Sequence, residues 1–207
     1  MSRELPMFPL GTVLFPRASL SLHVFEPRYR VMMHDCLRSD REFGVVLIER
    51  GSEVGGGDAR FAVGTVARVV RSAELPDGRY AVSAVGIRRA RVRTWLPDDP
   101  YPRADVEELD EAEAGAGADA ARVEASEAFG RVRDLYVRMD PGVHLEMPDG
   151  SSDPVAASFE LAAAAPLGPI DAQHLLEIDD SVERLLRLGS LLAEHARLLE
   201  AHLDDDR

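Results

Sequence analysis

The residues whose types and spacing could support chemistry are few. His23 and Glu26 lie three positions apart where an extended segment meets a predicted helix, which could place an imidazole beside a carboxylate for acid–base catalysis. No nucleophile or substrate pocket can be assigned around them, so we favour Glu26 as a helix-capping residue and His23 as part of a solvated strand face. Cys36 is the only cysteine. Its position on an apolar helix face favours a buried, inert thiol over a nucleophile.

The sequence gives little support for a metal site and excludes catalysis by lysine. His195 and His202 share one face of a predicted helix, but two ligands alone do not make a metal site. All 24 basic residues are arginine. This excludes from the sequence a P-loop, whose lysine contacts the phosphates, and a Ser–Lys protease dyad. We therefore expect a non-enzymatic protein with no catalytic residues, no cofactor and no metal.

The arginines could instead bind anionic groups. Arg28 follows a predicted helix start, where it could bind a carboxylate or carbonyls of its own domain, or a ligand. Arg89, Arg91 and Arg93 alternate with apolar residues along a predicted strand. They could contact an acidic peptide or an RNA backbone, or form a charged strand face that prevents aggregation.

The charge is unevenly distributed along the chain. Residues 1–104 contain 16 arginines and 12 acidic residues, a net charge of +4. Residues 105–207 contain 8 arginines and 25 acidic residues, a net charge of −17. The acidic second half disfavours binding along a nucleic acid, because its carboxylates repel the phosphates.

The first half is organised around a strand that runs directly into a helix. Apolar and polar residues alternate over 19–24, which predicts a half-buried strand. Pro27 suits the first position of a helix, since it has a fixed φ and no N–H to lose. An apolar face with helical spacing follows from Tyr29 to Leu37. We expect Phe25, Pro27 and Tyr29 to form a structural joint in which both rings pack beneath the helix.

The remaining first half favours a β-rich structure that closes into a small barrel. Residues 43–48 and 61–75 are predicted strands, Asp77-Gly78 a hairpin turn, and residues 51–58 a glycine-rich loop. Further strands are predicted over 79–85 and 87–96, with Gly86 as a kink or bulge, and a closing strand over 104–109. About six or seven strands and one helix would suffice for such a barrel.

The second half has a helical pattern. Residues 110–118 are acidic and rich in alanine and glycine, which predicts a flexible connector between subdomains 1–109 and 119–207. The first helix is expected to bury an apolar face from Val123 to Met139. Asp153, Asp171 and Asp180 are predicted to cap the next three helices. Four such helices predict a compact bundle and, with the first half, an α+β fold.

Several segments, taken in order, resemble the amino-terminal substrate-binding domain of Lon proteases. The resemblance covers roughly residues 5–203 and implies a PUA-like β-barrel followed by a helical half, with a role in binding protein substrates. The segments that carry it are Leu5–Leu10, Val13–Pro16, His23–Tyr29, Gly64–Val69, Asp77–Tyr80, Gly86–Val92, Ala172–Glu177 and Glu183–Leu185.

The leading functional hypothesis is a stand-alone, non-catalytic module that binds unfolded or flexible protein segments. Phe8 and Phe15 lie beside prolines in irregular chain and are, with Arg89, Arg91 and Arg93, the candidate peptide-binding residues. A separate protease or unfoldase is an expected partner. The alternatives are an RNA-associated PUA-like module, a small-molecule-binding domain and an unrecognised hydrolase. Without an apolar run long enough for a signal or a span, and with one cysteine, we expect a cytoplasmic protein that does not contact a membrane.

Overall fold

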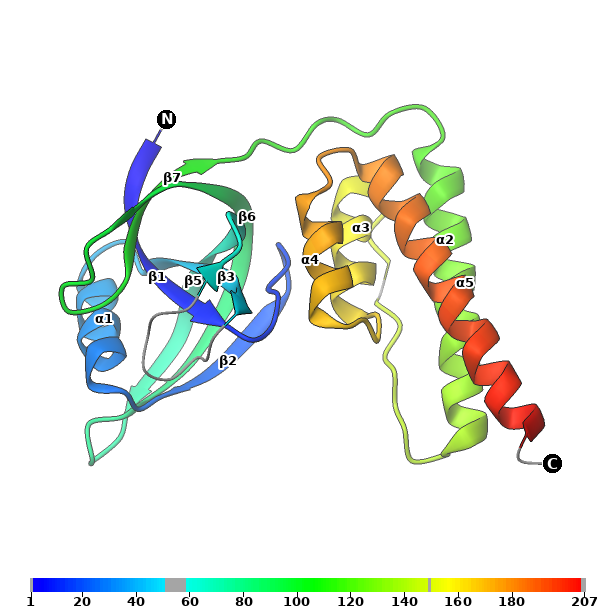
Figure 1. Ribbon diagram of the computed structural model, residues 1–207, viewed down its shortest axis with the longest axis horizontal. Coiled ribbons are helices and arrows are strands. Elements are labelled where there is room, and N and C mark those ends of the chain that lie inside the picture. The colour runs from blue at the N-terminus through cyan, green and yellow to red at the C-terminus, as the bar shows by residue number, and fades with distance from the viewer. Residues whose placement is uncertain (1, 51–58, 149, 206–207) are drawn as a thin grey trace. The chain divides into compact units, whose positions relative to one another are not determined.

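The computed structural model describes residues 2–50, 59–148 and 150–205. The chain divides into two compact units, Met1–Asp110 and Glu111–Arg207, hereafter unit 1 and unit 2. Each unit has its own buried core. The described part of unit 1 is made mainly of strands and that of unit 2 of helices (Figure 1). The glycine-rich loop predicted over residues 51–58 lies outside the described residues.

Unit 1 is a mixed sheet of seven strands with one helix in its described part. Five strands close into a ring in the order β1–β7–β6–β5–β3, because β1 pairs antiparallel with β7 and parallel with β3. Outside the ring, β2 pairs with β6 and the short β4 pairs with β3. The strands are β1 (Ser2–Leu10), β2 (Ser19–Val24), β3 (Glu42–Arg50), β4 (Ala59–Arg60), β5 (Val63–Glu74), β6 (Tyr80–Leu96) and β7 (Arg103–Glu108).

The long strand β6 connects the two parts of this sheet. Its first half pairs with β2 and its second half with β7, while β5 lies along its other edge. The register with β5 shifts opposite Gly86, as expected for a bulge, which bends the strand. A side chain at position 86 would lie 2.3 Å from the carbonyl oxygen of Phe15, so only glycine permits this approach. The predicted β5–β6 turn is present, with Gly78 at a φ of +76°.

Helix α1 (Pro27–Arg38) covers the main core of unit 1. Its predicted apolar face is confirmed, since Tyr29, Met32, Met33 and Cys36 are all buried. The ring of Tyr29 stacks on that of Phe8 with 4.2 Å between centroids. This stacking fixes the first turn of α1 on the sheet.

The described part of unit 2 contains four helices and the chain that leads into them. The acidic connector has no regular structure up to Gly117, but the Glu111 carboxylate already faces Arg184 of the last helix. The helices are α2 (Ala118–Met139), α3 (Pro154–Ala164), α4 (Pro169–Glu177) and α5 (Ser181–Asp205). α2 and α5 make the most extensive helix contact of the unit, with small residues such as Ala125 and Gly189 at their closest approach.

Two helix caps are confirmed and one is corrected. Asp153 accepts a hydrogen bond from the Val155 N–H at 3.0 Å, and Asp180 accepts one from the Glu183 N–H at 2.8 Å. Asp171, in contrast, lies inside the first turn of α4, which begins two residues earlier at Pro169. Pro169 starts this helix, since the proline ring suits the first helical position.

The apolar face predicted for α2 is only partly buried. Phe129, Val132 and Leu135 are in the core, whereas Val123 and Met139 are exposed. A regular apolar spacing marks a stripe on the helix, but the neighbouring helices cover only part of its length.

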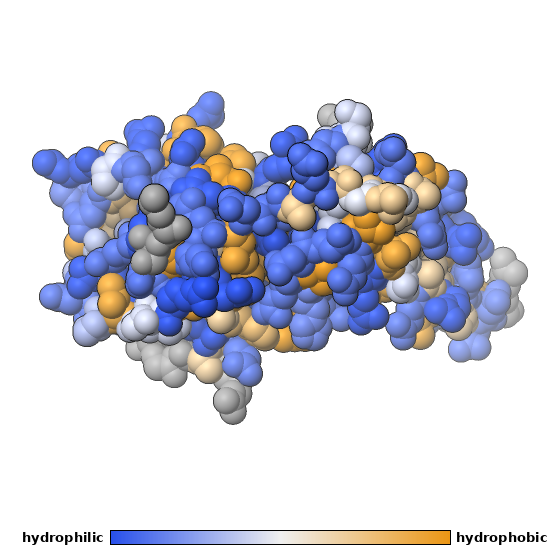
Figure 2. Space-filling view, turned by 90° about the horizontal axis from the view of Figure 1, so that it is seen from above, coloured by the Kyte–Doolittle hydropathy of each residue, from blue (hydrophilic) through white to orange (hydrophobic). Residues whose placement is uncertain are grey.

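Figure 2 shows a mostly polar surface interrupted by scattered apolar patches. Among the described residues, no helix is both long and apolar enough to cross a membrane.

Candidate functional site

A groove lies between α1 and the β5–β6 hairpin of unit 1. Its volume is about 390 Å³, and Pro27, Arg30, Val31 and His34 of α1 line one side. Glu74, Gly78 and Tyr80 of the hairpin line the other side. We call this feature the α1 groove. The strand-to-helix junction positions it, because Pro27 starts α1 where Val24 of β2 pairs with Tyr80 of β6.

Two apolar side chains are exposed on or just before α1, and one of them, Val31, lines the α1 groove. Phe25, two residues before Pro27, is 56% exposed, and Val31 is 43% exposed. The predicted joint is thus correct for Pro27 and Tyr29 but wrong for Phe25, whose ring does not pack beneath the helix. Tyr29 already fills that space by stacking on Phe8. An exposed aromatic ring is a usual feature of a surface that contacts other proteins.

The polar groups of the α1 groove include one cation without a carboxylate partner. The guanidinium of Arg30 lies above Gly78, where any side chain would collide with it. Among the described residues, Arg30 makes no ion pair. Burial raises the pKa of Tyr80, and the nearby Glu74 carboxylate raises it further. The groove therefore offers an available guanidinium and a neutral phenol beside apolar surface.

Arg28 does not face this groove as a free cation. Its Nε donates to Oε2 of Glu26 at 3.2 Å, and its guanidinium lies 4.6 Å from the ring centroid of Tyr29. This agrees with the interpretation in which Arg28 binds a carboxylate of its own domain. Glu26 precedes α1 but makes no side-chain capping bond, because its carboxylate is engaged by Arg28.

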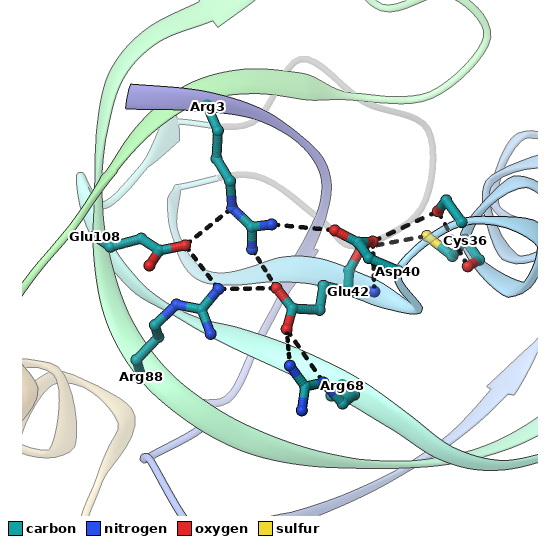
Figure 3. A network of polar contacts seen from close by, with 8 residues as sticks. Arg3, Cys36, Asp40, Glu42, Arg68, Arg88 and Glu108 are labelled. Carbon is teal, nitrogen blue, oxygen red and sulfur yellow. Dashed lines mark hydrogen bonds and ion pairs between the residues drawn. The ribbon is translucent and has the colours of Figure 1, made fainter. Parts of the chain in front are cut away.

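A second polar feature of unit 1 is an ion cluster to which every strand of the ring contributes one residue. Arg3 comes from β1, Glu42 from β3, Arg68 from β5, Arg88 from β6 and Glu108 from β7 (Figure 3). We call it the five-strand ion cluster. The Glu42 carboxylate lies at its centre and receives bonds from all three arginines, including Arg68 Nη2 at 2.5 Å and Arg88 Nη2 at 2.9 Å.

The five-strand ion cluster has a structural role. Glu42 is only 3% exposed. Burial alone would raise its pKa, but hydrogen bonds from Arg3 and Arg68 and the charge of Arg88 lower the pKa below its usual value. Glu108 and the exposed Asp40 balance the remaining charge. A carboxylate held ionised by three guanidiniums is a poor general acid or base, so the cluster stabilises the ring and has no arrangement suited to catalysis.

Cys36 lies behind this cluster and is buried, as expected. Its thiol contacts the carbonyl oxygen of Glu42 at 3.6 Å. Burial, together with the charges of Asp40 and Asp35, raises the pKa of the thiol to about 12. The thiol is therefore protonated and unreactive at neutral pH.

The predicted contact residues are mostly not on the surface. Phe15 is 2% exposed and Phe8 is buried under α1, so neither ring can form an exposed apolar rim. The expected irregular chain is also wrong for Phe8, which lies with Pro9 in β1, and a neighbouring proline does not show which way an aromatic ring points. Arg89 is fully buried, Arg91 is half-buried, and Arg93 is paired with Glu107. The basic stripe expected along β6 is therefore interrupted by burial and neutralised at one end.

The histidines are not brought together. His23 is exposed on β2, while Glu26 bonds to Arg28 instead. On α5, Nε2 of His195 lies 2.9 Å from the hydroxyl of Tyr136 on α2, so this histidine links two helices. Within the described residues, no three His, Cys, Asp or Glu side chains are grouped as metal ligands would be.

Sequence reasoning missed Arg30, Val31 and Tyr80 as groove residues. Val31 offered a signal, because it is an apolar residue lying off the apolar face of α1. Tyr80 offered none, since an aromatic residue at the start of a strand is ordinary core material. The groove forms only when the hairpin reaches α1 across nearly fifty residues of sequence.

Sequence reasoning also missed the buried arginine of unit 2. Arg184 on α5 donates to Ser158 Oγ at 2.7 Å and to the carbonyl oxygen of Ile178 at 2.6 Å. It lies 3.9 Å from the ring centroid of Phe159 and 3.4 Å from Glu111. This one side chain ties together α3, the end of α4 and the connector, which makes it structural.

Comparison with known proteins gives a consistent family. A family model described as the ATP-dependent protease La (LON) substrate-binding domain matches residues 4–194. The chain is 29% identical over 204 residues to Lon protease 2 of Herpetosiphon aurantiacus, covering 95% of this chain and 24% of that protein. It is 32% identical over 210 residues to Lon protease 2 of Sorangium cellulosum, covering 95% of this chain and 25% of that protein. The chain thus spans about a quarter of the length of these relatives.

Solved structures have the same fold. The crystal structure of a Lon N-terminal domain protein from Xanthomonas campestris has a TM-score of 0.65 at 27% identity, covering 91% of this chain and 98% of that chain. The N-terminal domain of the Mycobacterium avium complex Lon protease has a TM-score of 0.66 at 20% identity, covering 94% of this chain and 98% of that chain. The second similarity concerns the fold alone.

Proposed function

Because the chain belongs to the family of Lon substrate-binding domains, we propose that it binds unfolded or flexible segments of other proteins, and that the α1 groove with Phe25 is a contact surface. The observation that carries this proposal is the exposure of Phe25, two residues before the groove residue Pro27. Folded proteins usually bury aromatic rings, so an exposed ring at a hollow favours contact with a partner.

The composition of the groove suits polypeptide as a ligand. Phe25 and Val31 offer apolar surface to a side chain, while Arg30 and Glu74 offer a cation and a carboxylate to polar groups of the same segment. Such mixed lining accepts many sequences, because backbone amides and apolar side chains occur in every unfolded chain. Binding would require no cofactor and no catalytic residue, and a separate protease or unfoldase would act on the bound protein.

Two further parts of the proposal concern fold and location. We propose that the ring of unit 1 is a PUA-like barrel and that the four helices of unit 2 form a bundle. A lone cysteine in this sequence fits a reducing compartment, and we propose the cytoplasm. An RNA-binding role is less well supported, since Arg3, Arg68, Arg88, Arg93 and Arg103 of unit 1 are paired with carboxylates.

The experiment that tests the proposal measures binding of fluorescently labelled, reduced and carboxymethylated α-lactalbumin by anisotropy. Truncation of a central interface aromatic often costs about 2 kcal/mol, so Phe25→Ala is expected to weaken binding roughly thirtyfold. Val31→Ser is expected to weaken binding in the same direction. Thermal melts of both variants are expected to match the parent, because both side chains are exposed.

The matched control is Val70→Ser, which removes a similarly exposed apolar side chain on β5 that does not line the groove. Its binding is expected to equal that of the parent. No binding by the parent, or equal losses in Phe25→Ala and Val70→Ser, would contradict the proposal.

A further inference from the structure

Strand β2 is the one long strand of the described sheet that has a partner on only one side. Each of the five ring strands pairs with at least two neighbours, although residues 69–74 of β5 pair with β6 alone, and β4 has two residues. β2 has six residues and pairs with β6 alone. Its outer edge therefore carries backbone groups with no strand beside them.

The register shows which backbone groups these are. Ser19 lies opposite Val85, and the N–H of Gly86 donates to the carbonyl oxygen of Ala18 at 2.9 Å. In an antiparallel pair, this places Leu20, Leu22 and Val24 in the positions that bond to β6. The N–H and C=O groups of the alternate residues, Ser19, Ser21 and His23, point away from β6.

No described residue occupies these outward groups. Neither the backbone nor the side chains of Ser19, Ser21 and His23 make a hydrogen bond within the described part of the chain. The three side chains are also exposed. Three donor–acceptor pairs thus recur at every second residue, about 6.8 Å apart, which is the repeat of an extended polypeptide.

The edge lacks the features that usually prevent another strand from pairing. Proteins protect long edges with lysine, proline, bulges or inward-pointing charges. The sequence of β2 is Ser-Leu-Ser-Leu-His-Val. It contains no proline and no acidic or basic residue other than His23. The unprotected edge and its spacing are complementary to one kind of ligand, an extended backbone.

From this edge we propose that unit 1 captures an extended segment of an unfolded protein as an added strand on β2. The proposal deepens the proposed function, on which it rests, by assigning how the segment is held. The edge ends at Val24, immediately before the exposed Phe25, so an added strand would continue toward the α1 groove. Backbone bonding explains how one surface can accept many sequences.

The sheet face beside the edge adds a charge preference. A hollow of about 260 Å³ is lined by residues of β2, β5 and β6, among them Ser21, His23 and Arg71. Arg71 makes no ion pair with any residue that the structure describes. Binding of a segment that places an acidic side chain over this face is therefore favoured over binding of a segment with a basic side chain there.

The test uses one position and two substitutions in the full chain. Ser21→Pro removes the outward N–H and places a ring where the added strand would lie, yet breaks no bond to β6, because that N–H points outward. Ser21→Ala removes the hydroxyl and keeps the N–H. With labelled carboxymethylated α-lactalbumin as the probe, we expect Ser21→Pro to weaken binding about tenfold or more and Ser21→Ala to match the parent.

Amide hydrogen exchange in the parent protein gives a second measurement that does not depend on how the proline variant folds. Saturating probe is expected to slow exchange of the Ser19, Ser21 and His23 amides, which exchange fast in the free protein. The Leu20 and Leu22 amides, already bonded to β6, are expected to change little.

The outcomes separate this inference from the function on which it rests. If the parent binds and Phe25→Ala weakens binding, but Ser21→Pro matches Ser21→Ala and the outward amides gain no protection, the strand mechanism is wrong and the proposed function stands. If the parent does not bind the probe, the proposed function fails first. Protection that grows with protein concentration without probe would identify a second copy of the chain as the occupant and overturn the proposal.

Discussion

The guanidinium of Arg88 on β6 lies 2.9 Å from the carboxylate of Glu42 on β3, although β5 separates these two strands in the ring. The same guanidinium lies 2.6 Å from Glu108 on β7. Arg88 therefore bonds across the ring as well as to an adjacent strand. The five-strand ion cluster joins strands that the backbone ladder leaves apart, and it should matter for the stability of unit 1.

Glu42→Ala is expected to lower the free energy of unfolding by about 2–3 kcal/mol. Breaking a fully buried ion pair usually costs about 3–5 kcal/mol, and the smaller value reflects arginines that can reach solvent once the carboxylate is gone. The measurement is urea unfolding followed by circular dichroism. Glu49→Ala, an exposed glutamate on the same strand, is the control and should change stability little. Equal effects of the two substitutions would mean that the cluster does not stabilise unit 1.

The stability of the protein is expected to fall in acid partly through Glu42. Its pKa is lower in the folded protein than the value of about 4.3 for an unfolded chain. The stability that the ionised carboxylate adds to the folded protein is therefore fully present above about pH 4.3. It is lost as the pH falls through the lower pKa of the folded state. The free-energy difference between the parent and Glu42→Gln should shrink from pH 6 to pH 3. A difference that stays constant over this range would rule out Glu42 as a source of the acid sensitivity.

Arg184→Leu is expected to destabilise unit 2 by about 3–5 kcal/mol. The substitution leaves the hydroxyl of Ser158 and the carbonyl of Ile178 without their buried donor, and it removes the guanidinium from the Phe159 ring. Differential scanning calorimetry of the full chain measures the change. Arg187→Leu, on the exposed side of the same helix, is the control. A melting temperature unchanged from that of the parent would contradict the assigned role.

The Cys36 thiol is expected to be unreactive in the native protein. Burial raises its pKa to about 12, so almost no thiolate exists at pH 8. Ellman's reagent should therefore label the native protein slowly, if at all, and label one thiol at once in 6 M guanidinium chloride. Rapid labelling under native conditions would mean that α1 opens readily from the sheet.

Local sequence determined the elements whose signals act over a few residues. Pro27 marks the start of α1, Asp153 the start of α3, and Gly78 the tight turn between β5 and β6. The absence of lysine excluded two catalytic chemistries without reference to any coordinates. These conclusions hold because a fixed φ, a capping oxygen or a missing amine acts independently of distant parts of the chain.

Tertiary structure decided which residues face solvent. Phe15 was predicted to be a contact residue and Phe25 to pack beneath α1, yet Phe15 is 2% exposed and Phe25 is 56% exposed. Periodicity shows that a residue lies on a given face of an element, but not whether another element covers that face. The outward edge of β2 also depends on the order of the strands in the sheet. β2 pairs with β6 alone, and the register of β6 with β5 shifts at the bulge next to Gly86. The five-strand ion cluster likewise required charges separated by up to about a hundred positions to converge, because closure of the ring, and not their spacing in the sequence, brings them together.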